Sequence, residues 1–275
     1  FAKFRTEEVL EAVKKYKITL LWGNPAIFAG LYRRYSQSPD KFDLSSIRCC
    51  GSGTASFPED LYNNIKKLTS VPIIEGYGLT ETSAVTHCNS LDFQKVKSLG
   101  IPFPDVDAKI VDLKSGKILG INQAGELLLK GPQVFKDYWK KAEATVKKID
   151  KEGWLHTGDI VERDRDGYFY FRSRLDDMIN VRGEKVWPRE VEEVLESHSK
   201  VQEVAVIGVE DDYYGQAIKA CIVLKEGCQF SEEELIDFCK GKLAPHKVPH
   251  TVEFLKKLPR SYLGKILHYV LRKKS

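Results

Sequence analysis

Long hydrophobic runs are missing from this 275-residue sequence, and no uncharged apolar stretch approaches the about 18 residues that a membrane-spanning helix needs. Internal repeats and low-complexity segments are also missing. Neither sign of charge dominates, because 43 lysines and arginines stand against 39 aspartates and glutamates. We therefore expect no stable membrane insertion and no nucleic-acid partner, whereas a small anionic ligand is compatible with the net charge of +4.

No two of the six cysteines have the C-x-x-C spacing of a zinc or redox site, and only His87, next to Cys88, brings another soft metal ligand close in sequence. We expect free thiols in a reducing compartment, the cytoplasm, rather than a structural zinc site. The sequence begins at Phe1 without an initiator methionine or a signal peptide, so we expect a fragment or a processed product. The oligomeric state is left open.

The first part of the chain alternates short apolar runs with helical patterns, and its length allows about two domains in all. This alternation is typical of a parallel sheet covered by helices, in which ligands bind at the carboxyl ends of the strands. The apolar runs are residues 18–22, 47–50 and 71–74, and the helical patterns are residues 25–35 and 58–68.

Two regions with different sequence patterns follow. Strand patterns at residues 108–113, 125–130 and 168–172, the last after an Asp-Gly turn, indicate a β-rich region. Beyond it, helical patterns at 188–196 and 231–239 accompany strand patterns at 204–209 and 220–224. We predict an α/β fold with a partial parallel-sheet subdomain in residues 1–95, a β-rich subdomain in residues 96–173, and a small mobile α+β domain in residues 174–275.

The first motif that could bind a ligand is Gly-Tyr-Gly-Leu-Thr-Glu at residues 76–81, directly after an apolar run. Gly76 and Gly78 let the backbone approach a ligand closely, and Tyr77 offers a ring face to a purine. Thr80 and Glu81 could supply a phosphate hydrogen bond and an oxygen ligand for Mg²⁺. These residues suit a nucleotide, but a tight turn leading into a helix capped by Thr80 explains them equally well.

The second motif is Gly-Trp-Leu-His-Thr-Gly-Asp at residues 153–159. The carboxylate of Asp159 has two acceptor oxygens and could bind both hydroxyls of a ribose. An aspartate after Thr-Gly is also a common turn residue, so this alternative stays open. We interpret His156 as a packing or locally hydrogen-bonded residue.

The third motif begins with a charged stretch at residues 174–177, a natural domain junction, and continues to residue 184. The fixed donors of Arg174 suit ribose hydroxyls or a phosphate. A solvated linker with a surface ion pair is the alternative.

The fourth motif, residues 258–266, presents Lys265 directly after a glycine. A lysine in a mobile loop can reach a phosphate and neutralise charge that builds up in a transition state. Alternatively, Lys265 is one more cation of the basic tail.

In this order the four motifs are similar to those of the adenylate-forming enzymes, which include acyl-CoA synthetases, aryl-CoA ligases and firefly luciferase. The resemblance covers essentially the whole chain. It implies that Tyr77 stacks on adenine, Thr80 contacts the α-phosphate, Glu81 helps to hold Mg²⁺ and Asp159 binds the ribose. It further implies that the second half of the chain carries a hinge, a pantetheine contact and the adenylation lysine, at Asp176, Gly183 and Lys265.

The sequence departs from the family pattern in three places. The loop that includes Ser52, Gly53 and Thr54 takes the place of the family's adenine-side loop but lacks its usual Gly-Ala-Pro sequence. A plain strand-to-helix turn remains the alternative interpretation of this loop. Asn180 stands where luciferases have a lysine for their oxidative step, so light emission is not expected. The Ser/Thr/Gly-rich loop with Pro-Lys-Gly, which grips the β- and γ-phosphates in the family, is absent.

The resemblance therefore predicts the carboxyl-terminal half of an acyl-CoA synthetase, with ATP, Mg²⁺ and coenzyme A as ligands and the other half of the enzyme as partner. Residues 187–192 resemble fatty acyl-CoA synthetases more than amino-acid-activating domains, which implies a fatty or medium-chain acid as substrate. Two alternatives remain. One is an acyl-AMP ligase that loads a carrier protein, and the other is a non-catalytic fragment that lacks the phosphate loop.

Overall fold

The computed structural model describes residues 4–53, 57, 59–261 and 265–273. The chain divides into two compact units, one of Phe1–Thr157 with Glu162–Phe171 and one of Gly158–Val161 with Arg172–Ser275. The domain boundaries expected near residues 95 and 173 stay predictions. Thr54 and residues 262–264 of the fourth motif lie outside the described residues.

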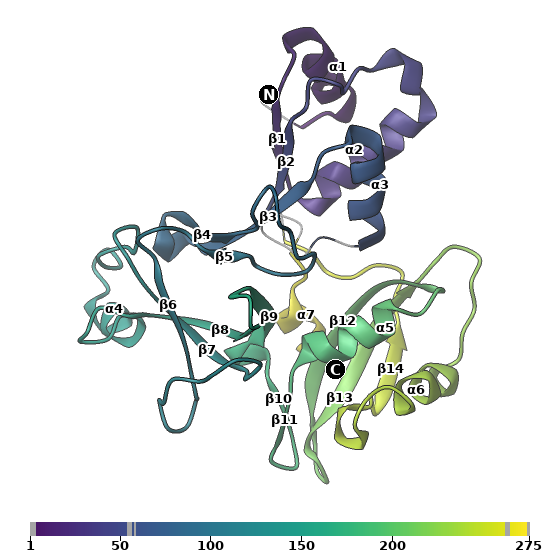
Figure 1. The fold of residues 1–275 in the computed structure, drawn as a ribbon. Helices are drawn as coiled ribbons and strands as arrows, with labels where there is room; N and C mark the ends of the chain where they lie inside the picture. The colour runs from purple at the N-terminus through teal and green to yellow at the C-terminus, as the bar shows by residue number, and fades with distance from the viewer. Residues whose placement is uncertain (1–3, 54–56, 58, 262–264, 274–275) are drawn as a thin grey trace. The chain divides into compact units, whose positions relative to one another are not determined.

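The first sheet of the first unit has five strands in the order β1-β2-β3-β4-β5 (Figure 1). Strands β1, β2 and β3 are parallel, whereas β3, β4 and β5 are antiparallel. The strands are Leu20–Gly23, Cys49–Ser52, Ile73–Leu79, Ala84–Cys88 and Ile101–Pro102.

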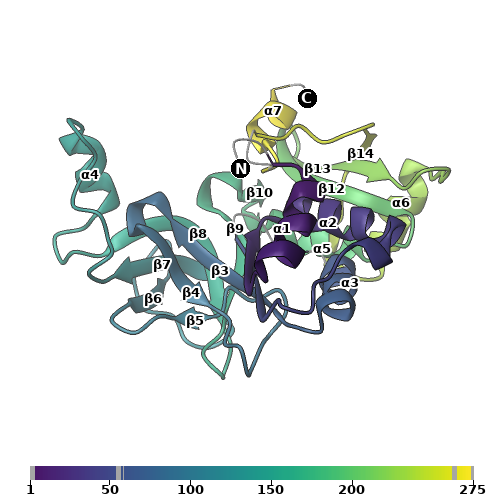
Figure 2. The ribbon, with the colours of Figure 1, turned by 90° about the horizontal axis from the view of Figure 1, so that it is seen from above.

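Three helices cover one side of the parallel strands, as both ribbon views show (Figures 1 and 2). They are α1 (Thr6–Tyr16), α2 (Pro25–Gln37) and α3 (Glu59–Thr69), and a 3₁₀ turn follows α2 at Pro39–Lys41. Buried side chains of the helices, such as Phe28 and Ile65, share one cluster with Cys50 and Ile73 of the strands. Burial of this apolar layer drives the packing and confirms the predicted helix-covered parallel sheet.

A second sheet has the order β6-β7-β8-β9. Its elements are β6 (Asp107–Val111), β7 (Gly125–Lys130), β8 (Leu155–Arg163) and β9 (Phe169–Arg174), with helix α4 (Ala142–Lys148) between β7 and β8. The predicted Asp-Gly hairpin joins β8 to β9. Gly167 has a φ of 84°, which favours glycine, and the amide of Asp164 donates to the carbonyl of Tyr168 over 3.0 Å.

The third sheet belongs to the second unit and has the order β11-β10-β13-β12, with β14 parallel to β13. The strands are β10 (Ile179–Val181), β11 (Glu184–Val186), β12 (Val201–Asp211), β13 (Gly215–Leu224) and β14 (Thr251–Phe254). The helices are α5 (Pro188–Glu196), α6 (Glu232–Lys240) and α7 (His268–Arg272), with 3₁₀ turns at Leu175–Asp177 and Pro245–Lys247. Ser231 and Glu234 form the predicted capping box of α6.

Alternation along β12 and β13 gives this sheet two apolar faces. Val204 and Ile222 pack with α5 and α6, whereas Ala205 and Cys221 pack with Leu271 of α7. The predicted class, an α/β fold with a partial parallel sheet, a β-rich part and a small α+β part, is confirmed. Within the described part of the chain, no helix has the length and apolarity to cross a membrane.

Candidate functional site

The first four residues of the glycine-rich motif, residues 76–79, lie inside strand β3, not after it. The first half of β3 pairs in parallel with β2, and its second half, from Gly76 onward, pairs antiparallel with β4. The register shifts between Tyr77 and Gly78, and a Cβ on Gly78 would come 1.6 Å from the carbonyl oxygen of Ala84. Glycine is therefore required where β4 crosses close to β3, and the alternative of a tight turn is wrong for residues 76–79.

The ring of Tyr77 is half-buried and held by His87 on the neighbouring strand. The ring centroids lie 5.6 Å apart in an edge arrangement, and the opposite contact of His87 is Phe169, at 4.7 Å. Thr86 Oγ1 lies 2.9 Å from Nδ1 of His87. Burial lowers the pKa of His87 to about 3, so the imidazole is a neutral packing partner at physiological pH.

The Thr80–Thr82 segment forms a single 3₁₀ turn at the end of β3. Its cap residue is Leu79, whose amide donates to the buried Oγ1 of Thr82 over 2.9 Å, so the idea of a helix capped by Thr80 is wrong. The side chain of Thr80 is consequently exposed at the turn. It is available to a ligand rather than committed to a cap.

Glu81 is held from a distant segment. The Tyr138 hydroxyl donates to Oε1 of Glu81 over 2.5 Å, and the amide of Phe135 donates to the Glu81 carbonyl over 2.7 Å. The hydrogen bond to Glu81 raises the pKa of Tyr138 to about 12, so Tyr138 remains a donor at physiological pH. Sequence reasoning missed Tyr138, since no local pattern relates residues 57 positions apart.

The donor set around Glu81 suits Mg²⁺ only in the presence of a phosphate ligand. No group of three or more His, Cys, Asp or Glu side chains that could hold a metal occurs among the residues that the structure describes. Mg²⁺ commonly binds one or two carboxylates together with substrate phosphates and water. A single fixed carboxylate fits that pattern.

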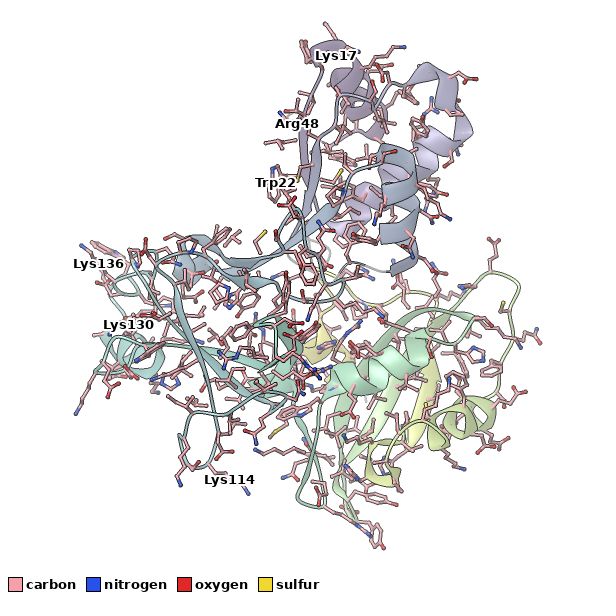
Figure 3. All side chains as sticks on the ribbon, viewed as in Figure 1. Lys17, Trp22, Arg48, Lys114, Lys130 and Lys136 are labelled. Carbon is pink, nitrogen blue, oxygen red and sulfur yellow. The ribbon has the colours of Figure 1, made fainter. Side chains whose placement is uncertain are left out.

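The end of β2 lies beside the start of the motif. Ser52 pairs in register with Glu75, and a Cβ placed on Gly53 would lie 3.6 Å from the carbonyl oxygen of Gly76. Before them, Gly51 is covered by the ring of Trp22, which would clash with any Cβ there. Figure 3 labels Trp22 on strand β1. The carboxyl ends of these parallel strands thus bring Ser52 and Gly53 next to Gly76, where such sheets bind ligands.

Ser52 has a further property of a binding residue. Its side chain is 1% exposed, and its Oγ has no hydrogen-bond partner among the described residues. A buried hydroxyl without a partner is unfavourable by about 1–3 kcal/mol, which a bound ligand could recover.

Asp159 lies in the middle of β8, so its interpretation as a turn residue is wrong. Its buried Oδ1 is 2.7 Å from Nε of Arg174, the last residue of β9, whose side chain is 48% exposed. The pair therefore links a buried carboxylate to a guanidinium that reaches solvent. His156 on the same strand bonds Oε2 of Glu126 over 3.0 Å, which confirms its local hydrogen-bonding role.

Asp176 is exposed in the 3₁₀ turn Leu175–Asp177 directly after β9. Gly183 lies in the turn between β10 and β11 with a φ of 88°, and its amide donates to Oδ1 of Asn180 over 2.8 Å. The Arg182 guanidinium beside it stacks 3.7 Å from the ring centroid of Tyr213. Asn180, noted from the sequence only as a departure, therefore fixes the turn that carries Gly183.

Lys265 has an exposed side chain on a fixed backbone. Its amide donates to Oγ of Ser261 over 3.1 Å, and its carbonyl accepts from the Ser261 amide over 2.8 Å. The next residue, Ile266, pairs with Arg260 in an antiparallel bridge. The ammonium group of Lys265 is therefore presented from an anchored position.

The predicted site residues fall into two sets. The first unit holds Ser52, Gly53 and the 76–81 motif, which the structure brings together. The second unit holds Asp159 and Arg174, which form a pair, and three residues on separate segments, namely Asp176, Gly183 and Lys265.

Comparison with known proteins gives a consistent result. The family model described as AMP-binding enzyme matches residues 1–139, and the model described as AMP-binding enzyme C-terminal domain matches residues 190–265. A relative named long-chain-fatty-acid–CoA ligase, from Bacillus subtilis, is 42% identical over 96% of this chain and 47% of its own length. The chain spans about half the length of the curated relatives it matches.

Solved structures are similar over the whole chain. ATP-bound MatB from Rhodopseudomonas palustris superposes with a TM-score of 0.90 at 31% identity, covering 100% of this chain and 54% of that one. The anthranilate CoA ligase AuaEII in complex with anthranoyl-AMP gives a TM-score of 0.83 at 34% identity, covering 98% and 52%.

Proposed function

The chain belongs to the family of AMP-binding enzymes, and from this premise we propose that it forms part of an acyl-CoA synthetase. The observation that carries the proposal is the joined end of β2 and β3, where Ser52 and Gly53 meet Gly76 beside a fixed Tyr77 ring and a fixed Glu81 carboxylate. This edge offers close backbone approach, an aromatic face and one hard oxygen ligand. These are the groups that an adenosine phosphate needs.

Tyr77 would stack on adenine, and Ser52 and Gly53 would contact its edge. The Asp159 carboxylate would accept hydrogen bonds from the ribose hydroxyls while its ion pair with Arg174 keeps it oriented.

In the first half-reaction, the substrate carboxylate attacks the α-phosphorus of ATP. A carboxyl oxygen–phosphorus bond forms, the bond to the β-phosphate oxygen breaks, and pyrophosphate leaves. No base is needed, because the carboxylate is already ionised. Thr80 would donate to the α-phosphate and Lys265 would neutralise its developing charge. Mg²⁺ bound at Glu81 would neutralise charge on the phosphates.

In the second half-reaction, the thiolate of coenzyme A attacks the acyl carbonyl carbon. The carbon–sulfur bond forms, the mixed-anhydride bond breaks, and AMP leaves. We assign residues 174–275 to a mobile domain that turns at Asp176 between the two steps and brings the Gly183 turn to the pantetheine arm.

The acid is proposed to be a fatty acid. The Bacillus subtilis relative is named for long-chain fatty acids, and the zebrafish (Danio rerio) relative, 35% identical, is named for medium-chain acyl groups. This sequence contains no loop with Pro-Lys-Gly, so we assign the grip on the β- and γ-phosphates to residues outside it.

The test is carboxylate-dependent ATP–pyrophosphate exchange by the full-length gene product, with a series of acids from acetate to stearate and with benzoate for comparison. We expect exchange to be strongest with medium or long alkyl chains. Coenzyme A and a phosphopantetheinyl carrier protein are then compared as acceptors in competition. Exchange with none of the acids would refute the synthetase proposal, and preference for the carrier would replace it with the acyl-AMP ligase.

A further inference from the structure

Helix α7 begins three residues after Lys265 and carries two basic side chains on one face. His268 and Arg272 are four positions apart, so they project from the same side of the helix. Leu271, three residues after His268, is buried against β12 and β13. The helix therefore has an apolar anchor on the sheet and a basic face toward another element.

That element is the 3₁₀ turn Leu175–Asp177, which follows β9. Nδ1 of His268 lies 3.4 Å from Oδ2 of Asp177, and Arg272 donates to the other oxygen of the same carboxylate. Asp177 is the residue directly after Asp176, the proposed hinge. We call these three residues, Asp177, His268 and Arg272, the Asp177 clasp.

A buried acidic residue of α5 completes the surroundings of His268. Nε2 of His268 lies 3.9 Å from Oε1 of Glu192, and this carboxylate also accepts the amide of Val206 over 3.1 Å. Arg189 pairs with the same Glu192 at 3.6 Å. His268 is thus enclosed by two carboxylates and Arg272, and each of its ring nitrogens faces one carboxylate.

The backbone before Lys265 is anchored separately. Arg260 forms an ion pair of 3.0 Å with Glu203 on β12, and the amide of Leu267 donates to the carbonyl of Pro259 over 2.9 Å. Lys265 therefore lies between an anchor on the sheet and an anchor at the hinge turn. Loss of the second anchor would free the α7 side while the sheet contacts remain.

We propose that Asp177 is a positioning residue for Lys265, because the clasp fastens the helix after the lysine to the turn after the hinge. The lysine-bearing segment and the hinge turn then rotate as one rigid body. This inference rests on the proposed function, since Lys265 and Asp176 have their roles only in an adenylating enzyme. The role goes beyond the hinge and the lysine themselves, because it assigns a task to three residues that touch no substrate.

The protonation states favour the clasp near neutral pH. Burial alone would lower the pKa of His268, but the hydrogen bond to Asp177 and the charges of Glu192 and Asp177 raise it above its usual range. Burial alone would raise the pKa of Asp177, but the hydrogen bond from His268 and the charges of His268 and Arg272 lower it overall. The carboxylate is therefore ionised where the imidazole is protonated.

The test compares Asp177→Asn with Asp237→Asn in the full-length gene product. Asp237 pairs with Lys240 over 2.7 Å on the exposed side of α6 and serves as the matched control. We expect Asp177→Asn to lower the kcat of ATP–pyrophosphate exchange by about 10- to 100-fold, because small displacements of a catalytic group are costly. The KM for ATP should change by less than about threefold, and thioester formation from supplied acyl-adenylate should be largely retained.

Two further variants separate positioning from folding. Asp177→Glu keeps the acceptor and should restore part of the exchange rate, whereas Arg272→Gln, at a partly exposed position, should repeat the selective loss. An unchanged exchange rate in Asp177→Asn, or an equal loss of both half-reactions in both Asp177→Asn and Arg272→Gln, overturns the proposal. A wild-type protein inactive in both half-reactions counts instead against the proposed function and removes the basis of this inference.

Discussion

Asp159 and Arg174 form an ion pair of 2.7 Å between the neighbouring strands β8 and β9, in which the carboxylate is buried and the guanidinium is half-exposed. Strand pairing fixes both backbones, so the carboxylate has one orientation before any ligand arrives. Such preorganisation favours binding, because a ligand does not have to order these groups itself.

Replacement of this carboxylate tests its role in nucleotide binding. Asp159→Asn keeps the side-chain volume but loses the charge and one acceptor. We expect the affinity for AMP to fall by about 10- to 100-fold, since a hydrogen bond to a charged group contributes about 1.5–3 kcal/mol. Isothermal titration calorimetry measures the change. Glu126→Gln, on the adjacent strand β7 and bonded to His156, is the control and should bind AMP normally.

The hydroxyl of Tyr138 fixes one oxygen of Glu81. Tyr138→Phe removes this donor without changing the ring, so we expect the Mg²⁺ concentration for half-maximal exchange to rise by about 5- to 50-fold. Tyr62→Phe, which loses a hydroxyl bonded to the neutral Gln94 over 2.7 Å, is the matched control. Equal Mg²⁺ dependence of the two variants would show that the bond to Glu81 has no role in the site.

The Asp177 clasp makes the free energy of unfolding depend on pH, in a direction that the pKa shifts of His268 and Asp177 determine. The folded-state pKa of His268 is raised, so its contribution is fully present below its usual value of about 6.5 and is lost as pH rises through the raised value. The folded-state pKa of Asp177 is lowered, so its contribution is present above about 4 and is lost as pH falls through the lowered value.

Urea unfolding of the wild type and of His268→Gln at a series of pH values checks this prediction. The wild type should be more stable by about 1 kcal/mol between about pH 5 and 6, and the difference should shrink toward pH 9. A difference that grows with rising pH would contradict the assignment of a raised pKa to His268.

The turn at Gly183 separates backbone strain from contact with a substrate. Gly183 and Gly227 both have positive φ values, 88° and 76°, and a Cβ would meet no atom within 4 Å at either position. Replacement of either glycine by alanine should lower the free energy of unfolding by a similar amount, about 1 kcal/mol. Only Gly183→Ala should slow thioester formation from acyl-adenylate. Slowing of adenylation alone would contradict the role of this turn in the second step.

Local patterns were sufficient for the elements that bury one apolar face. The predicted strand at residues 125–130 matches β7 residue for residue, and the capping pair Ser231 and Glu234 begins α6 as expected. These signals are short-range, because side-chain periodicity and a cap lie within the element itself.

The remaining elements depend on contacts between segments that are far apart in the sequence. The glycine-rich motif has the residues of a turn, but β4 pairs with it and so extends β3 to Leu79. Asp159 follows Thr-Gly, a pattern common in turns, but it lies within strand β8. Strands β4, β5, β8, β10, β11 and β14 and helices α4 and α7 were not predicted. The bonds from Tyr138 to Glu81 and from Arg272 to Asp177 join residues 57 and 95 positions apart, a separation that no sequence pattern reveals.

The central claim, that Lys265 serves adenylation and not thioester formation, is tested most directly by measuring both half-reactions of Lys265→Ala in the full-length gene product. Lys257→Ala, another exposed lysine of the basic tail, is the control. We predict that Lys265→Ala abolishes ATP–pyrophosphate exchange while it still converts supplied acyl-adenylate and coenzyme A to the thioester, and that Lys257→Ala retains both activities. Equal loss of both half-reactions in Lys265→Ala, or full exchange by that variant, would contradict the account.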